Sequence, residues 1–523
     1  YRGYKVTKPG ELLDVLSIDE IDFEQFLSKY VLAHRPCVIR GIIPNIQISK
    51  FKSDEIIDTL KYMQFLQVER KNKGGFGLGT SRCKMTLEEL LTKFKKGDEG
   101  WYLTTQYLED EPGDELETGP EDDDTGSEVR QVDESDNDSE EEEEEAGELF
   151  PSEITDGFSD TSSINMNDMH DDFEEDEEEE NDENDDDDDP VIGFAGRNGL
   201  RISEARARIK ELLQPPLVAL AKSPLVLPIK TSLLDFLIPQ QINLWMGLSK
   251  PTSKDGNENE NGKFPIDESS SDLNLGRRVP GGGSSSGLHH DHADNLYIPI
   301  QGFKRFTLFS PSNCGDLYTV GDISRVYNSG VIDYKRNSNA PNWRHLRADG
   351  AIITEVARYK LQEESNKLTK IEKKELLDLI TEEEEGEGEE EEEISDVSKD
   401  LDPPSFSRIP SALLHLDKVK DLETKRKIQE YAKEKFPKFL PISENKIVVD
   451  LKPGEMLYLP VGWFHEVTSF GKEDQDNKDN IHIALNYWFL PPDGKDLSKP
   501  YSDDYWSKDF ERTTKSIELL QQG

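Results

Sequence analysis

Residues 284–310 read SSSGLHHDHADNLYIPIQGFKRFTLFS, and this stretch decides both the fold and the chemistry. It holds a His-x-Asp pair, His289 and Asp291, followed by two strand-like runs at 296–300 and 305–309. Because side chains two residues apart on a strand point to the same face, His289 and Asp291 can reach one metal ion. We predict a short turn over 301–304 between the two strands.

A second histidine, His465, ends the run PGEMLYLPVGWFH at 453–465, just past another predicted strand. Two histidines and one carboxylate on one face of a metal leave the other positions open, which is the ligand set of the non-haem Fe(II) oxygenases. The His-x-Asp pair alone is also found in ordinary polar turns. His290 and His292 alternate with the pair and would be structural, whereas a register shift of one residue would make His290 the ligand.

Lys304 follows His289 by fifteen residues and falls at the start of the next predicted strand. A lysine that points inward from a strand is costly unless it meets an anion. An inward Lys304 therefore predicts an anionic ligand, and the competing interpretation is a solvent-facing lysine in a turn.

Four runs in this order resemble the JmjC-domain (cupin-like) oxygenases: SGLHHDHADNLY at 286–297, QGFKRFTLFSP at 301–311, PGEMLYLPVGWFH at 453–465 and ALNYWF at 484–489. They are most similar to the small JmjC hydroxylases. That group includes the asparaginyl hydroxylase of hypoxia-inducible factor and the lysyl hydroxylase of developmentally regulated GTP-binding proteins. Residues 35–40, 102–107 and 243–247 also resemble the group, so the similarity covers most of the chain outside the acidic tracts.

The resemblance implies an Fe(II) centre, with 2-oxoglutarate and O₂ as cosubstrates, whose metal ligands and catalytic residues are His289, Asp291 and His465. It implies that Lys304 pairs with the distal carboxylate of 2-oxoglutarate, helped by the hydroxyl of Ser286, where many relatives carry threonine. It implies that Asn295 and Asn486 line the cosubstrate pocket near its metal-chelating end.

The fold class implied is mainly β with surrounding helices (α+β): a double-stranded β-helix, or jelly roll, with long disordered acidic insertions. The expected division of the chain is 1–108, N-terminal part of the fold; 109–198, acidic disordered insertion; 199–250, fold resumed; 251–283, flexible polar insertion; 284–335, first half of the jelly roll; 336–445, helical and acidic insertion; 446–492, second half of the jelly roll; and 493–523, C-terminal helix.

Outside the site, hydrophobic periodicity predicts helices over 21–32, 85–94, 203–213, 368–380, 418–435 and 504–522. It predicts strands over 36–40, 101–107, 242–248, 447–451, 455–459 and 481–489. Trp463 and Phe464 are expected to pack the barrel mouth rather than shape a substrate channel, and Trp488 is expected in the core. The last helix offers an apolar stripe either for a homodimer or for docking onto the fold.

The acidity of the chain is concentrated in two tracts. The chain has 110 acidic and 62 basic residues and a net charge of −48. Residues 109–189 contain 42 acidic residues and one basic residue, and residues 381–396 contain 11 acidic residues and no basic one. Like charges at this density repel, so we expect disorder there. The tracts either keep the chain soluble or attract a basic protein.

Composition also excludes several classes of protein. No apolar run is long enough to span a membrane, and no basic footprint for DNA is present. Three scattered cysteines, Cys37, Cys83 and Cys314, form neither a disulfide framework nor a Cys-x-x-Cys zinc site. A reducing compartment, cytoplasm or nucleus, is expected. Because the chain begins at Tyr1 rather than at a methionine, its start says nothing about a targeting peptide.

The leading hypothesis is an Fe(II)- and 2-oxoglutarate-dependent dioxygenase that hydroxylates a Lys, Arg or Asn side chain of a protein, and a basic protein is one candidate substrate. Demethylation of methyl-lysine in a histone or other protein is the second hypothesis, because hydroxylating an N-methyl group releases formaldehyde. Hydroxylation of a modified tRNA base is the third. A non-enzymatic scaffold whose acidic tracts bind basic proteins is the alternative from a different class.

Overall fold

The computed structural model describes residues 1–44, 46–71, 75–76, 82–106, 202–221, 223, 225–249, 264–394, 402–471, 480–494 and 498–522. The first acidic tract, for which the sequence predicts disorder, lies outside the described residues. So do residues 251–263 of the polar insertion.

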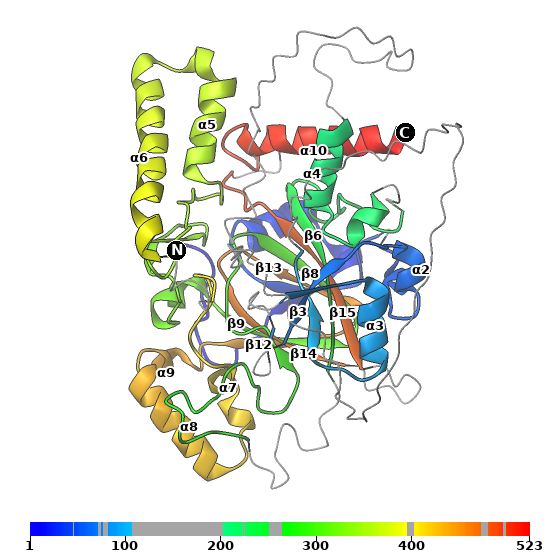
Figure 1. Cartoon of the computed structure of the whole chain (residues 1–523), viewed down its shortest axis with the longest axis vertical. Helices are drawn as coiled ribbons and strands as arrows, with labels where there is room; N and C mark the ends of the chain where they lie inside the picture. The colour runs from blue at the N-terminus through cyan, green and yellow to red at the C-terminus, as the bar shows by residue number, and fades with distance from the viewer. Residues whose placement is uncertain are drawn as a thin grey trace, which may run out of the picture. The chain divides into compact units, whose positions relative to one another are not determined.

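Two β-sheets form the centre of the fold, and Figure 1 shows their crossing strands. The larger sheet has the order β1 (Asp14–Ser17), β2 (Cys37–Arg40), β13 (Glu455–Leu459), β8 (Asp294–Gln301), β15 (Ile481–Phe489), β6 (Pro239–Leu248), β5 (Trp101–Leu103), β3 (Leu66–Arg70) and β4 (Arg82–Met85). The smaller sheet has the order β12 (Ile447–Leu451), β9 (Phe303–Phe309), β14 (Phe464–Phe470) and β7 (Ser284–Ser285). Neighbouring strands are antiparallel except β1 and β2, which are parallel.

The two sheets form the jelly-roll core predicted from the sequence. One buried cluster joins them, with Tyr297 of β8 and Leu457 of β13 from the large sheet and Phe306 of β9 from the small sheet. The opposite face of the large sheet packs against helices, because strand side chains alternate. In β15, Leu485 belongs to this helix-covered core, whereas its neighbour Asn486 lines the pocket between the sheets.

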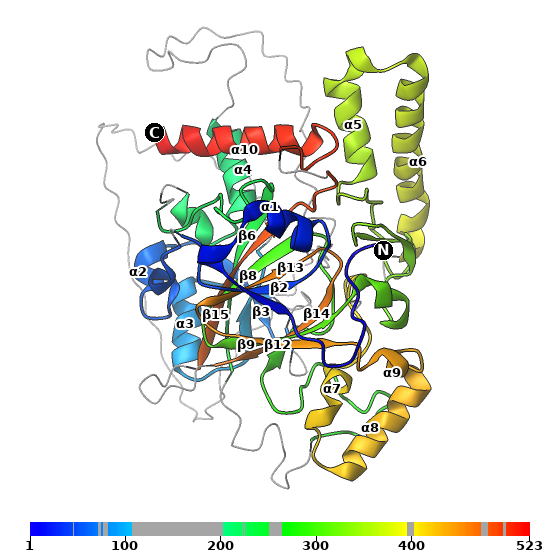
Figure 2. The same ribbon diagram turned by 180° about the vertical axis from the view of Figure 1, so that it is seen from behind.

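Helices surround the sheets, as Figures 1 and 2 show from opposite sides. Their bounds are α1 (Phe23–Phe26), α2 (Ile56–Leu60), α3 (Leu87–Lys95), α4 (Ile202–Leu212), α5 (Ile353–Glu363), α6 (Lys370–Ile394), α7 (Ser411–Leu414), α8 (Leu422–Lys435), α9 (Phe439–Ile442) and α10 (Tyr505–Gln522). A π-helical turn, η2 (Leu27–Val31), continues α1. A separate apolar cluster joins α7, α8 and α9 to the small hairpin of β10 (Ile323–Val326) and β11 (Ile332–Tyr334).

Helix α3 shows why the local signals were readable. Its N-cap is Thr86, whose hydroxyl accepts a hydrogen bond from the Glu89 backbone at 3.2 Å. The Glu89 carboxylate accepts one in return from the Thr86 backbone at 2.7 Å, which completes a capping box. The apolar positions identified in the sequence, Leu87, Leu90, Leu91 and Phe94, are all buried.

The turn predicted over 301–304 does not join a hairpin. Strands β8 and β9 lie in different sheets, so the chain changes sheet at Gly302. This glycine has a φ of +71°, and a Cβ there would collide with the backbone oxygen of Phe470. The alternation of apolar and polar residues and the turn residues between them identify both strands. These local signals do not show which other strand pairs with β8 or with β9.

Part of the segment predicted to be a flexible insertion is ordered. Residues 264–283 form turns that bury Leu275, Val279 and the charged Arg277. The polar composition of this segment misled the prediction, because its few apolar residues and one guanidinium are all used for packing. It lies against the stretch that leads to the metal ligands, as described below.

Two further predictions need correction. The helix expected over 368–380 is α6, which continues to Ile394 through most of the second acidic tract, since glutamate is a good helix former. The strand expected over 101–107 ends at Leu103. Beyond Leu103, a side chain replaces the backbone in pairing with β3. The side chain of Gln106 exchanges two hydrogen bonds with the backbone of Gln67, at 2.8 and 3.1 Å.

The C-terminal helix α10 packs against α4. Tyr505 is buried and meets the ring of Tyr359 edge-on, with centroids 5.2 Å apart. The first turn of α10 therefore docks onto the fold, and a homodimer through the rest of the helix stays a prediction. In the described part of the chain, no helix is both long and apolar enough to cross a membrane.

Candidate metal centre and pocket

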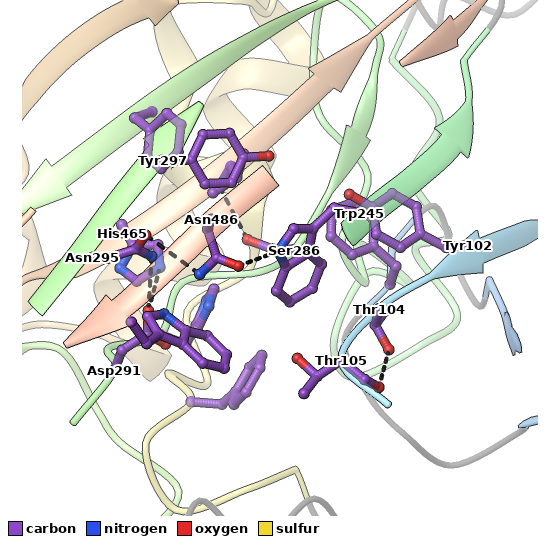
Figure 3. Close-up of a pocket in the computed structure, with 16 residues that line it drawn as sticks. Tyr102, Thr104, Thr105, Trp245, Ser286, Asp291, Asn295, Tyr297, His465 and Asn486 are labelled. Carbon is purple, nitrogen blue, oxygen red and sulfur yellow. Dashed lines mark hydrogen bonds and ion pairs between the residues drawn. The ribbon is translucent and has the colours of Figure 1, made fainter. Parts of the chain in front are cut away.

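Backbone pairing brings the three candidate ligands together. The His289 amide donates to the His465 carbonyl at 3.0 Å, and the His465 amide donates back to the His289 carbonyl at 2.7 Å. Asp291 lies two residues further along, so its carboxylate faces the same space. One ligand atom from each of His289, Asp291 and His465 lies within 4.8 Å of the others. Residues 174 positions apart in sequence thus form one site (Figure 3).

The two imidazoles are oriented for metal binding. Nδ1 of His289 lies 3.0 Å from the carbonyl oxygen of Gly287, and Nδ1 of His465 lies 3.0 Å from that of Trp463. A carbonyl oxygen can only accept, so each Nδ1 carries the proton and each Nε2 keeps its lone pair. Nε2 of His465 lies 3.7 Å from a carboxylate oxygen of Asp291. A cation between these two atoms could therefore bind both of them.

Electrostatics favour the neutral form of His289. Burial, with a smaller contribution from His465, holds the pKa of His289 well below its usual range. A metal binds neutral imidazole, so no proton has to be displaced from Nε2 at neutral pH. The Asp291 carboxylate supplies the negative charge that a divalent cation needs.

His290 and His292 point away from this space. Nε2 of His290 lies 2.5 Å from the hydroxyl of Tyr334, and Nε2 of His292 lies 3.0 Å from the carbonyl oxygen of Ile332. Both histidines are fully buried structural side chains. The structure adopts the register in which His289, rather than His290, faces His465.

The two asparagines form a chain that ends on the carboxylate. Trp245 Nε1 donates to Asn486 Oδ1 at 2.8 Å, and Asn486 Nδ2 donates to Asn295 Oδ1 at 3.4 Å. Asn295 Nδ2 in turn lies 3.4 Å from Asp291 Oδ2. Figure 3 shows these side chains in the same pocket. Asn295 and Asn486 therefore lie beside the three candidate ligands, and both line the pocket.

A pocket opens beside the three ligands, and all three of them line it. Its walls are largely aromatic, and they come from both sheets and from loops. The aromatic lining residues are Phe76, Tyr102, Trp245, Tyr297, Phe306, Phe406 and Trp488. Thr104, Thr105 and Ser286 add hydroxyl groups.

Lys304 contacts the pocket wall through Tyr102, which lines the pocket. It is fully buried, and its ammonium donates to Ser469 Oγ at 2.7 Å, to Tyr102 Oη at 3.3 Å and to His482 Nδ1 at 3.2 Å. None of these partners is an anion, and burial together with Lys71 holds the pKa of Lys304 well below its usual range. Among the described residues, no carboxylate lies within ion-pair distance of this ammonium.

A second lysine lies in the same network. Lys71 donates to Ser284 Oγ at 2.9 Å, and this oxygen lies 2.9 Å from Ser249 Oγ. Ser249 Oγ in turn lies 3.3 Å from Nε2 of His482, whose other nitrogen accepts from Lys304. Burial lowers the pKa of Lys71 to about 8. Lys304 is fully buried and Lys71 is half-buried, and the groups that connect the two lysines are neutral.

Ser286 is engaged with the backbone. Its hydroxyl donates to the Gly287 carbonyl at 2.8 Å and accepts from the Val467 amide at 3.0 Å. The side chain lines the pocket, as expected for a cosubstrate contact. One lone pair of its oxygen remains for a ligand.

Sequence reasoning missed three residues of the site. Tyr102 lies in a run noted for its resemblance, but nothing there indicated that its hydroxyl would meet Lys304. Phe406 stacks on the His289 ring, with centroids 4.7 Å apart, although it comes from the insertion and carries no sequence signal. Trp488 is buried in an apolar cluster, as expected, but nothing indicated that it would also line the pocket, where its buried Nε1 has no partner among the described residues. Trp463 and Phe464 are packing residues, as predicted.

Comparison with known proteins agrees with this geometry. A family model described as a cupin-like domain matches residues 23–495, so the chain belongs to the cupin-like family. Within it, the chain is a JmjC protein, and the JmjC cupin-like proteins are generally Fe(II)- and 2-oxoglutarate-dependent oxygenases. The chain is similar to JmjC domain-containing protein 4 of Schizosaccharomyces pombe, with 25% identity over 96% of this chain and 90% of that protein.

The residues present fit both groups that the family implies. Two neutral imidazoles and one carboxylate match Fe(II), which accepts mixed nitrogen and oxygen ligands and leaves positions open in this arrangement. The buried Lys304 ammonium, with only neutral partners, fits one carboxylate of a dicarboxylic acid.

Proposed function

We propose that the protein is an Fe(II)- and 2-oxoglutarate-dependent dioxygenase that hydroxylates a side chain of a protein substrate. The observation that carries the proposal is the convergence of His289, Asp291 and His465, with both Nε2 lone pairs facing a pocket. When bound, Fe(II) with 2-oxoglutarate and O₂ supplies the oxidant for C–H hydroxylation, and 2-oxoglutarate leaves as succinate and CO₂.

The side chains of this protein orient the reactants. His289, Asp291 and His465 would hold the metal on one face, and the Gly287 and Trp463 carbonyls fix the two rings in the binding tautomer. The Asn486–Asn295 chain ties the Asp291 carboxylate in place, so the pocket side of the metal stays open.

Lys304 and Tyr102 would hold the far carboxylate of 2-oxoglutarate. The Tyr102 hydroxyl lines the pocket and touches the ammonium, so it connects the charge to the cavity. A carboxylate there would restore the charged form of Lys304, because a nearby anion raises a lysine pKa. The apolar walls exclude water from the reaction.

The charge of the chain favours a basic protein as the substrate. The 42 acidic residues between 109 and 189 would attract a basic protein and raise its local concentration. We expect the target side chain to be Lys, Arg or Asn, and we expect the protein in the cytoplasm, the nucleus or both.

The experiment loads the protein with Fe(II) without air, then adds O₂, 2-oxoglutarate and a lysate fraction rich in basic proteins. Succinate is followed by NMR, and the lysate peptides by mass spectrometry. Wild type should form succinate and add one oxygen to one peptide, and His465→Ala should do neither. His345→Ala is the matched control, since this half-exposed histidine pairs with Asp333, away from the pocket.

The competing functions predict different products. Loss of a methyl group with release of formaldehyde would establish a demethylase, and an added oxygen in tRNA would establish a base hydroxylase. A scaffold would retain a basic partner equally well in His465→Ala and lose it when residues 109–189 are deleted. Failure of the wild-type protein to bind Fe(II) would refute the oxygenase proposal.

A further inference from the structure

One buried guanidinium, that of Arg277, joins three chain segments that wall the pocket. Arg277 comes from the stretch whose composition suggested a flexible insertion, yet only 9% of its surface is exposed. Its Nη1 donates to the carbonyl of Phe76, and at 2.7 Å to the carbonyl of Ser286. Both of these residues line the pocket.

The same guanidinium holds the third segment. Arg277 Nη2 lies 3.3 Å from a carboxylate oxygen of Asp402, and the guanidinium carbon lies 4.8 Å above the ring of Phe406. Phe406 stacks on the ring of the metal ligand His289, at an interplanar angle of 9°. Arg277 and His289 therefore lie against the ring of one phenylalanine.

Backbone hydrogen bonds attach both aromatic segments to the stretch that carries the metal ligands. The Phe76 amide donates to the Ser285 carbonyl at 3.0 Å, and the Ser407 amide donates to the Leu288 carbonyl at 2.8 Å. Gly287 leaves room for the guanidinium: it has a φ of +74°, and a Cβ there would lie 2.8 Å from Arg277 Nε. The position of Arg277 is thus built into the local backbone.

We propose that Arg277 is a positioning residue that fixes the aromatic walls Phe76 and Phe406 relative to the metal ligands. Arginine suits this task because its planar group can meet two carbonyls, a carboxylate and a ring together, which a lysine ammonium cannot. The consequence for turnover rests on the proposed function: the walls hold the substrate carbon at the reacting distance. Because Phe406 follows the second acidic tract in sequence, Arg277 also ties that insertion to the site.

The test compares Arg277→Lys with Arg278→Lys in the full-length protein by hydrogen exchange. Arg278 is the matched control, because its guanidinium donates to the carbonyl of Asn274 rather than to the pocket segments. In Arg277→Lys, peptides covering Phe76 and Ser407 should exchange about tenfold faster, as expected for the loss of buried hydrogen bonds. Equal protection of these peptides in the two variants would overturn the proposal.

A milder variant covers the case in which Arg277→Lys does not fold. Asp402→Asn keeps the guanidinium and its two carbonyl contacts but removes the ion pair. It should speed exchange around Ser407 more than around Phe76. Unchanged exchange around Ser407 would count against the arrangement. This measurement needs neither metal nor substrate, so it gives its answer even if the proposed function fails.

The second readout is the coupling of the two half-reactions, measured with the substrate peptide from the lysate experiment. Misplaced walls should raise the ratio of succinate to hydroxylated peptide in Arg277→Lys and leave the KM for 2-oxoglutarate unchanged. A small misplacement of a reacting carbon lowers product formation by up to roughly 100-fold. An unchanged ratio would show that Arg277 is structural only. Absence of succinate in the wild type would refute the proposed function, and hydrogen exchange would still decide the geometry.

Discussion

The two ends of the pocket suit ligands of opposite charge. At the metal end, His289 and His465 direct lone pairs and Asp291 directs a carboxylate toward one point, so this end needs a cation. At the lysine end, Lys304 lies buried and Lys71 half-buried among hydroxyls and the neutral ring of His482, and Lys304 has no anionic hydrogen-bond partner, so this end can take an anion. Burial makes a polar group without a partner costly at either end.

The difference shows what kind of molecule the pocket accepts. A ligand that chelates a metal with one end and carries a carboxylate at the other would satisfy both ends at once. Neither end alone would define it: a histidine cluster accepts many metals, and a buried lysine accepts many anions. The jelly roll separates the two ends by facing β9 and β14 against β8 and β15.

The largest effect is expected at the metal end, from Asp291→Ala. Removing the carboxylate leaves two neutral ligands and no negative charge for a divalent cation. Fe(II) affinity should fall by more than the roughly 100-fold that loss of an outer-shell partner costs, and succinate formation should fall to background. Calorimetric titration with Mn(II) as the probe measures the affinity. Tight Mn(II) binding by Asp291→Ala would show that the metal end does not depend on this carboxylate.

At the lysine end, Lys304→Met should separate stability from cosubstrate binding. Loss of a charge-assisted contact should raise the KM for 2-oxoglutarate about 10- to 100-fold and leave Mn(II) affinity unchanged. The ligand-free variant should be as stable as wild type or more so, since a buried amine without an anionic partner is replaced by an apolar chain. Urea unfolding measures this, with the exposed Lys95→Met as control. A strongly destabilised Lys304→Met would mean that the ammonium is structural.

Lys71 should show itself in the pH dependence of stability. Burial lowers the pKa of Lys71 to about 8, whereas the unfolded lysine titrates at its ordinary value of 10.5. Between these values only the unfolded chain holds the proton, so stability should rise with pH. From about pH 8 to about pH 9.5, wild type should gain about 1.5 kcal/mol relative to Lys71→Met. If the free energy of unfolding changes with pH in the same way in the two proteins, Lys71 does not contribute to the lysine end as described.

The smallest effect is expected from Ser286→Ala, which asks to which end this hydroxyl belongs. Losing the bond to the Val467 amide should cost about 1 kcal/mol of unfolding free energy, measured in urea. If the hydroxyl only ties the backbone, the KM for 2-oxoglutarate should stay the same. A rise in that KM, with Mn(II) affinity unchanged, would assign Ser286 to the lysine end.

The local elements and the ligand trio were readable from the sequence because their signals are local. Strands β12, β13 and β15 have the predicted bounds, and α3, at Leu87–Lys95, lies within two residues of the helix predicted over 85–94. The face of each strand was also readable, since it follows from counting by two. Counting by two put His289 and Asp291 on one face, but it left His290 open as the ligand after a shift of one residue, and the backbone pairing of His289 with His465 decides between the two.

Partners distant in sequence could not be read in this way. Nothing in the sequence says that Phe406 would cover His289, that Tyr102 would touch Lys304, or that Trp488, a buried core residue, would also line the pocket. The segment around Arg277 was misjudged for the same reason. Its polar composition resembles a solvated loop until its carbonyl and carboxylate partners are brought to it.

The sequence by itself therefore determined which reactive residues are present: a His-x-Asp pair and a distal histidine, a lysine near the start of the next strand, two acidic tracts and a strand-rich chain. Only the tertiary structure shows that Lys304 points inward. The tertiary structure alone decided how these meet, by placing the strands before and after Gly302 in different sheets and by pairing His289 with His465 across 176 positions. The physical reason is that strand alternation is set by each residue's own backbone. Strand partnership, by contrast, is set by burial of the whole core.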